Sequence, residues 1–419
     1  MQASSRNAAA PGALEGQASA SVLRVCGAMR AGLFIALIAA ALLGGQVQDS
    51  LAQKRPPASP SESTKTSPRK EVTPRKETGR SADPYTVGFV TGTPQCTEFA
   101  IAQDIATTLA SGQETGPRGE VALRILPIVG NGGIRNVLDV LTLAGADVAI
   151  APVVLVDRLR ETRTFGDISG RLTYIAPLHV EEFHLLARPE IRSLSELSGK
   201  RVNLGEDGSA GAILGREVLN RLGVKISESN LGPEAALDGL RKGDLSAALL
   251  VSGKPVSFLT QVSQLDDIHL LPIPYSSELL QEAYLPSTLR HQDYPNIIAA
   301  EASVDTIAIQ SALFAYNWPS GNERFRLLEF FVQTLFSRFP EFLGDAHHPK
   351  WREVNLAAQL PGWRRFRPAE RWLQQQSSGE AALRKAFGRF IEEKPTANPP
   401  DREELFRDFL RWRERNPAK

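Results

Sequence analysis

From residue 85 onward the sequence alternates short β-branched segments with segments of helical spacing, and this alternation constrains the fold more than any other feature. Residues 85–90 are typical of a buried strand, and residues 97–111 carry apolar side chains at the spacing of one helical face. Further strands are expected at 121–126 and 147–150, with a glycine-rich loop and a helix between them. Strands that alternate with helices predict parallel sheets whose ligand-binding loops lie at the carboxyl ends of the strands.

The same rhythm restarts further along the chain, which predicts a second α/β lobe. Strands are expected at 172–176, 182–187, 199–204, 245–251, 306–309 and 312–315. In the simplest topology the chain leaves the first lobe near Pro177 and returns after Pro274. We therefore predict an α/β fold of two lobes joined by a hinge, with a C-terminal α-helical extension. The expected boundaries are 84–177 and 273–340 for lobe I, 178–272 for lobe II, and 341–419 for the extension.

The N-terminal residues 1–52 have the pattern of a targeting segment. Met29 and Arg30 precede an apolar run at 31–44, and Ser50 and Ala52 supply small residues at the −3 and −1 positions of a cleavage site. The run is shorter than the ~20 apolar residues that span a bilayer. We therefore expect a signal peptide and an exported, periplasmic protein. An uncleaved membrane anchor through 31–44 is the alternative, and the start at Met1 or Met29 is left open.

Residues 53–83 are predicted to be a disordered linker. They contain five prolines, eight basic and four acidic residues, and a single valine as their only large apolar side chain. Without apolar surface to bury, the entropy lost on ordering such a segment is not recovered.

Charge and cysteine content exclude further classes of protein. The formal net charge is +1 at pH 7, so the chain as a whole is not an electrostatic binder of nucleic acid or of anionic membranes. Cys26 precedes the apolar run, so a processed chain keeps only Cys96 and cannot form an internal disulfide.

Three loops that precede helices, at 91–97, 130–133 and 205–210, are the candidate ligand site. Free backbone N–H groups at helix starts favour an anionic ligand, and glycine permits close approach of the backbone. The residues expected to line the cleft are Thr91, Thr93, Asn131, Gly132, Gly133, Ser209 and Ala210, with Arg135 and Lys254 as charged candidates. The alternatives are plain helix caps for the loops and solvated surface positions for the two basic side chains.

Enzymatic sites have weaker support. His347 and His348 resemble a metal pair, but no Cys or His partner stands at ligand spacing. Cys96 with His179 or His184 as its base lacks a third group that would order them. We therefore predict no catalytic residue, no metal and no cofactor.

Aromatic residues are concentrated in the C-terminal quarter, which holds all five tryptophans. Residues 325–339 place Phe and Leu on one helical face. Amphipathic helices that cover the first lobe explain this pattern. A docking surface for a membrane partner is the alternative, because Trp and Arg are frequent interface anchors.

Several segments resemble the TAXI family, the solute receptors of one class of tripartite ATP-independent periplasmic (TRAP) transporters. They are IRSLSELSGKRV at 191–202 with GEDGS at 205–209, GGIRN at 132–136 with GADV at 145–148, and LDGLRKGD at 237–244 with VSGKP at 251–255. The resemblance spans roughly 85–316, although the loop at 91–97 lacks the tyrosines usual in the family. It implies a type II periplasmic-binding-protein-like fold, a small carboxylate ligand such as glutamate, and a TRAP-type permease as partner.

The primary hypothesis is therefore a periplasmic solute receptor that delivers a small, carboxylate-bearing solute to that permease, with no nucleic acid partner. The alternatives are a periplasmic sensor or scaffold that docks through its aromatic C-terminus, and an enzyme on the same fold.

Overall fold

The computed structural model describes residues 85–111, 123–263, 266–276 and 284–393, together with residues 409 and 411. The predicted signal peptide, the alternative anchor at 31–44, the predicted linker and Trp412 lie outside these residues. None of the helices in the described ranges has the length and apolar character needed to cross a membrane.

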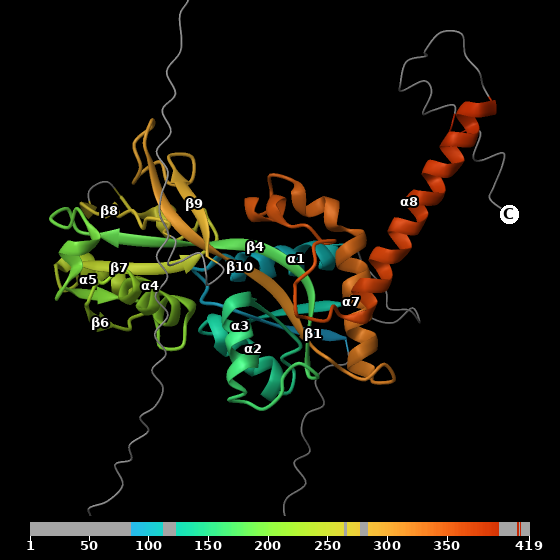
Figure 1. Ribbon diagram of the computed structural model, residues 1–419, viewed down its shortest axis with the longest axis horizontal. Helices are drawn as coiled ribbons and strands as arrows, with labels where there is room; N and C mark the ends of the chain where they lie inside the picture. Colours follow the sequence, from blue (N-terminus) through green and yellow to red (C-terminus); the bar gives the residue numbers. More distant parts are fainter. Residues whose placement is uncertain are drawn as a thin grey trace, which may run out of the picture. The chain divides into compact units, whose positions relative to one another are not determined.

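One mixed sheet organises the described chain, with the strand order β2-β1-β3-β10-β4-β7-β5-β6 (Figure 1). It contains two parallel units of the same topology. The first unit contains β1 (Thr86–Thr91), β2 (Arg124–Val129) and β3 (Val148–Pro152), and the second contains β5 (Arg201–Asn203), β6 (Ser227–Ser229) and β7 (Ala247–Ser252). In each unit the first strand lies between the other two and pairs with both in parallel. This repeated arrangement confirms the predicted α/β fold.

Two long strands, β4 (Leu172–Ala187) and β10 (Ser303–Tyr316), connect the two units. They run antiparallel to each other; β10 also pairs with β3, and β4 also pairs with β7 (Figure 1). The short strands β8 (His269–Leu270) and β9 (Leu285–Arg290) pair with β4 and β10, respectively.

The prediction of four separate strands in these two stretches was wrong. The intervening residues stay extended because β4 and β10 pair through them, with a register irregularity between Gln310 and Ala312. The chain therefore crosses between the units twice along continuous strands, while the exact lobe boundaries remain a proposal.

Helices follow the strands as the alternation predicts. The first unit carries α1 (Thr97–Ser111), α2 (Gly133–Thr142) and α3 (Val153–Thr162). The second unit carries a π-helical turn (Gly211–Gly215) that continues into α4 (Arg216–Arg221), and α5 (Pro233–Lys242). Buried apolar side chains on the sheet form the core, with Phe89, Ile101 and Ile105 among those of the first unit and Val202, Leu214 and Leu249 among those of the second.

The C-terminal part packs on the first unit. It consists of α7 (Glu323–Ser337), two 3-10 segments (Phe339–Leu343 and Pro349–Glu353) and α8 (Arg367–Glu393). Trp351 is buried and its indole N–H donates to Asp104 at 2.8 Å. Trp363 donates to Asp157 at 2.8 Å and lies under the Arg160 guanidinium, 4.9 Å from the ring centroid. These tryptophans therefore act in packing.

A buried ion pair attaches the segment Pro349–Glu353 to β4. Lys350 and Glu182 are each only 1% exposed, and the Lys350 ammonium donates to Glu182 Oε1 at 2.6 Å and to Glu353 Oε1 at 2.8 Å. Burial raises the pKa of the Glu182 carboxyl, and the adjacent Lys350 charge opposes that rise. The C-terminal part is thus anchored at the strand that crosses between the two units.

Candidate functional site

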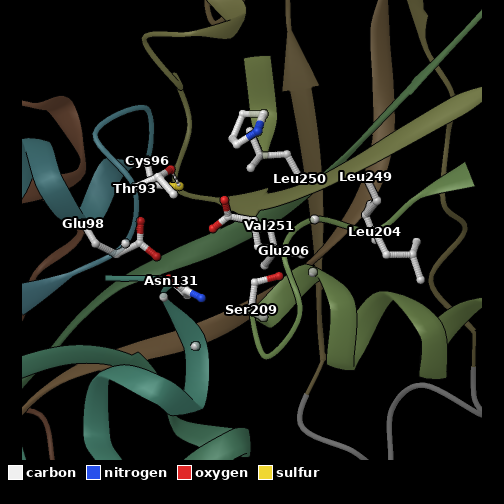
Figure 2. Close-up of a pocket in the computed structure, with 17 residues that line it drawn as sticks. Thr93, Cys96, Glu98, Asn131, Leu204, Glu206, Ser209, Leu249, Leu250 and Val251 are labelled. Atoms are coloured by element: carbon white, nitrogen blue, oxygen red, sulfur yellow. Dashed lines mark hydrogen bonds between the residues drawn. The ribbon is translucent and has the colours of Figure 1, made fainter. Parts of the chain in front are cut away.

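A pocket lies between the two units, where loops from both meet (Figure 2). Its cavity volume is about 50 Å³. The first unit contributes Gly92, Thr93, Cys96, Glu98, Asn131, Gly132 and Gly133, and the second contributes Leu204, Gly205, Glu206, Ser209, Ala210, Gly211, Pro233, Leu249, Leu250 and Val251. The loops follow the carboxyl ends of β1, β2 and β5, which is where ligands bind in open α/β sheets.

The loop after β1 is held by its own side chains. Thr93 Oγ1 lies 3.3 Å from Cys96 Sγ, and the Thr93 carbonyl accepts from the Cys96 amide at 2.9 Å. The start of α1 is already engaged across the sheet, because the Thr97 amide donates to Ser252 Oγ at 2.9 Å. Thr97 Oγ1 also donates to the Gly253 carbonyl.

The loop after β2 touches the loop after β5. Gly132 and Gly133 both have positive φ angles, 75° and 59°. A Cβ atom at Gly133 would lie 2.7 Å from the Ala210 amide nitrogen, closer than real Cβ contacts come. Only glycine therefore permits this approach of the two units.

Ser209 caps the turn that follows it. Its hydroxyl accepts from the Ala212 amide at 3.1 Å, as expected of a residue at a helix start. The π-helical turn Gly211–Gly215 begins in the pocket wall, and π turns are frequent at functional sites.

Two further contacts join the units beside the pocket. Gln95 Nε2 donates to Glu234 Oε1 at 2.9 Å, and Arg158 of α3 forms an ion pair with Glu217 of α4. Together with the contact at Gly133, these interactions join the two units around the pocket.

Six of the predicted cleft residues come together in this lining: Thr93, Asn131, Gly132, Gly133, Ser209 and Ala210. Three others lie elsewhere. Thr91 is fully buried and its hydroxyl donates to the Gly92 carbonyl at 3.0 Å. Arg135 has a side chain that is 58% exposed and pairs with Asp139 at 2.9 Å, one turn along α2. Lys254 pairs with Asp293 at 3.1 Å and donates to the Thr288 carbonyl.

Two acidic residues, Glu98 and Glu206, also line the pocket and were not predicted from the sequence. Glu98 is 4% exposed, and burial raises the pKa of its carboxyl to about 7. Glu181 of β4 lies close enough for the two carboxyls to influence each other, and burial raises its pKa well above the usual range. Glutamate is common in the first turn of a helix, so the position of Glu98 in the sequence did not indicate a role in ligand binding.

Comparison with known proteins places the chain in a family. A model of the NMT1-like family matches residues 89–357, which is more than half of the chain and includes every loop of the pocket. The chain belongs to the NMT1-like family. The match ends at residue 357, after the 3-10 segment Pro349–Glu353, so α8 lies beyond the matched region.

Solved structures with a distant similarity include a mutant of the arginine-binding protein ArgBP from T. maritima, at 16% identity and a TM-score of 0.39, covering 64% of this chain and 96% of that one. A protein described as a periplasmic transporter has 15% identity and a TM-score of 0.40, covering 60% and 83%. The substrate-binding protein AbpA of an amino acid ABC transporter from Streptococcus pneumoniae, bound to L-arginine, has 14% identity and a TM-score of 0.37, covering 64% and 92%.

Burial shifts the pKa values of the residues that were considered for catalysis. Burial raises the pKa of the Cys96 thiol far above its usual value, and the nearby Glu98 carboxyl adds to the rise, so the nucleophilic thiolate is disfavoured. His184 donates to or accepts from Tyr294 at 2.7 Å, and burial lowers the pKa of His184 to about 3. Burial likewise lowers the pKa of His179 well below its usual range.

His347 and His348 bind protein groups rather than each other. His347 Nε2 lies 2.9 Å from Thr108 Oγ1, and His348 Nδ1 accepts from the Lys350 amide at 3.2 Å. Within the described ranges no three His, Cys, Asp or Glu side chains group as metal ligands would.

Proposed function

We propose that the protein is a solute-binding receptor that closes its two units around a small molecule. The observation that carries this proposal is the pocket itself, whose walls come from both units at the carboxyl ends of parallel strands. A site of this kind forms only when the units approach, so binding and closure are coupled. The contacts of Gly133, Gln95 and Arg158 across the boundary belong to the closed state.

The two continuous strands that join the units suit such a movement. Only β4 and β10 cross between the parallel units in the described sheet, so a small change in their twist opens or closes the pocket. The crossing is braced by buried polar groups, among them Ser311 Oγ, which donates to the Glu181 carboxylate. We propose export to the periplasm and delivery to a TRAP-type permease as the setting, supported by the targeting pattern of residues 1–52 and the TAXI-like segments.

The ligand class implied by that resemblance is a small carboxylate. Backbone N–H groups at the starts of α2 and of the turn after Ser209 are the groups in the lining suited to an anionic end of the solute. Arg135 is not part of this proposal, since it pairs with Asp139 outside the lining.

A panel of amino acids, carboxylates, amines and sugars, screened by thermal shift and then by isothermal titration, tests the proposal. A receptor binds one solute per chain and returns it unchanged. Ala210→Trp fills the pocket and should abolish binding, whereas Ala300→Trp, at an exposed position outside the lining, should not. Consumption of the solute would favour an enzyme, and no binding by any class would remove the receptor function.

A further inference from the structure

The pocket has an unbalanced charge. Glu98 comes from the first turn of α1 and Glu206 from the loop after β5, and Figure 2 shows their carboxylates directed into the same space from opposite units. The residues that line the pocket include no Lys, Arg or His. Among the ion pairs formed by the described residues, none involves Glu98 or Glu206.

Glu98 has weak compensation for its burial. Its carboxylate accepts from its own backbone amide and from Ser252 Oγ at the long distance of 3.5 Å, and the neighbouring acidic group Glu181 is itself buried. Buried carboxylates are almost always paired, because removing an ionised group from water costs several kcal/mol. A favourable interaction with the helix dipole would explain a glutamate at position 98, in the first turn of α1. It would not explain why Glu206 faces it from the other unit.

The rest of the lining is apolar on the second-unit side. Leu204, Leu249, Leu250 and Val251 border the space next to the two carboxylates. These side chains cannot form hydrogen bonds, and they suit the hydrocarbon part of a solute.

We propose that the pocket selects solutes that carry a protonated nitrogen, an ammonium or guanidinium group, held between Glu98 and Glu206 with its aliphatic part against the leucines. This inference rests on the proposed receptor function. A cation between one carboxylate from each unit attracts both, so the charged group that confers selectivity also draws the units together. An anionic end, where the solute has one, lies at the helix-start N–H groups.

A matched set of four-carbon solutes tests the selectivity: putrescine with two ammonium groups, 4-aminobutyrate with one ammonium and one carboxylate, and succinate with two carboxylates. These are titrated beside amino acids and guanidines from the panel. Binding confined to solutes with a cationic nitrogen supports the inference. Succinate binding as tightly as its amine counterparts overturns the inference and leaves the receptor function intact. Absence of binding by every charge class overturns both.

Three variants assign the effect to the proposed residues. Glu98→Gln and Glu206→Gln keep the shape and remove the charge, and each should weaken binding of the cationic solute at least tenfold. Glu301→Gln changes the net charge equally at an exposed position outside the lining and should leave the affinity within twofold. Since neutralising the buried Glu98 removes a desolvation cost, that variant is expected to fold. Unchanged affinity in Glu98→Gln and Glu206→Gln overturns the assignment.

Discussion

The backbone contact between the two units at Gly133 gives the sharpest prediction about closure. Gly133→Ala introduces a methyl group 2.7 Å from the Ala210 amide nitrogen and 3.1 Å from the Gly208 carbonyl oxygen. Ordinary van der Waals contact begins near 3.4 Å, so the loops must separate by several tenths of an ångström. The atoms that the new methyl group meets belong to the backbone of residues 208–210, so no side-chain rotation can relieve the clash.

Two costs are combined in that substitution. Alanine at a φ of 59° is strained by about 1–2 kcal/mol, which lowers the free energy of unfolding. The clash adds a second cost that applies only when the units are closed. A loss of 1.4 kcal/mol in the closed state is a tenfold loss of affinity, and we expect at least that much.

Gly208→Ala is the matched control, because Gly208 has a φ of 81° and no atom within 4 Å of its added methyl group. It carries the backbone strain without the clash. Isothermal titration with a solute that the wild type binds should show a tenfold or greater loss for Gly133→Ala and less than threefold for Gly208→Ala, with both melting temperatures lowered. Equal affinities in the two variants would refute the closed contact.

Three further predictions follow from buried and surface charges. Affinity for a cationic solute should rise about tenfold per pH unit up to pH 7 and then level off, because the solute binds the ionised Glu98 carboxylate, and burial raises the pKa of Glu98 to about 7. Burial also raises the pKa of the neighbouring Glu181 and Cys96 and lowers that of His179. Titrations between pH 5 and 8 should show the rise for the wild type and not for Glu98→Gln, and a flat series for the wild type would contradict this. Lys350→Met should lower the free energy of unfolding, measured by urea denaturation, by about 3–5 kcal/mol, because it leaves the buried Glu182 carboxylate without its cationic partner. The double variant Lys350→Met with Glu182→Gln should recover part of that loss. A change below about 1 kcal/mol in the single variant would show that the pair is not buried in solution. Arg135→Ala should alter stability by less than about 1 kcal/mol and leave affinity within twofold, because the Arg135 side chain is 58% exposed and lies outside the pocket lining, and a tenfold loss of affinity would restore Arg135 as a ligand partner.

The burial of Glu98 also sets the sign of a stability effect. Its pKa is raised in the folded state above its ordinary value of 4.5, so the folded protein binds more protons than the unfolded chain between pH 4.5 and 7. Stability from this group is therefore present below pH 4.5 and is lost as pH rises to about 7. The loss should disappear in Glu98→Gln.

The sequence was sufficient for the features that depend on local periodicity. The alternation of strand and helix segments predicts the parallel units, and the carboxyl-end rule predicts that the loops with Thr93, Asn131 and Ser209 face one another. Local periodicity did not predict that β4 and β10 are each one continuous strand. Residues between 176 and 182 extend because β10 pairs with them, and that pairing joins residues far apart in the sequence, such as Pro177 with Ala312 and Glu181 with Ile309.

Side-chain direction explains the remaining differences at the site. Arg135 lies in the first turn of α2, but its position on the helix places it over Asp139 rather than in the pocket. Lys254 is next to a pocket strand in sequence, yet its ammonium reaches Asp293 and the Thr288 carbonyl. Glu98 has the pattern of an ordinary first-turn acid, and only its burial by the second unit distinguishes it.

A crystal structure of the protein with the solute that raises its melting temperature most tests the central claim directly. We expect the solute between the two units, in contact with Asn131 of the first and Ser209 of the second, with a cationic nitrogen between Glu98 and Glu206. A solute bound instead in the open groove lined by Val153, Arg158 and Leu360, with the pocket between the loops empty, would contradict it.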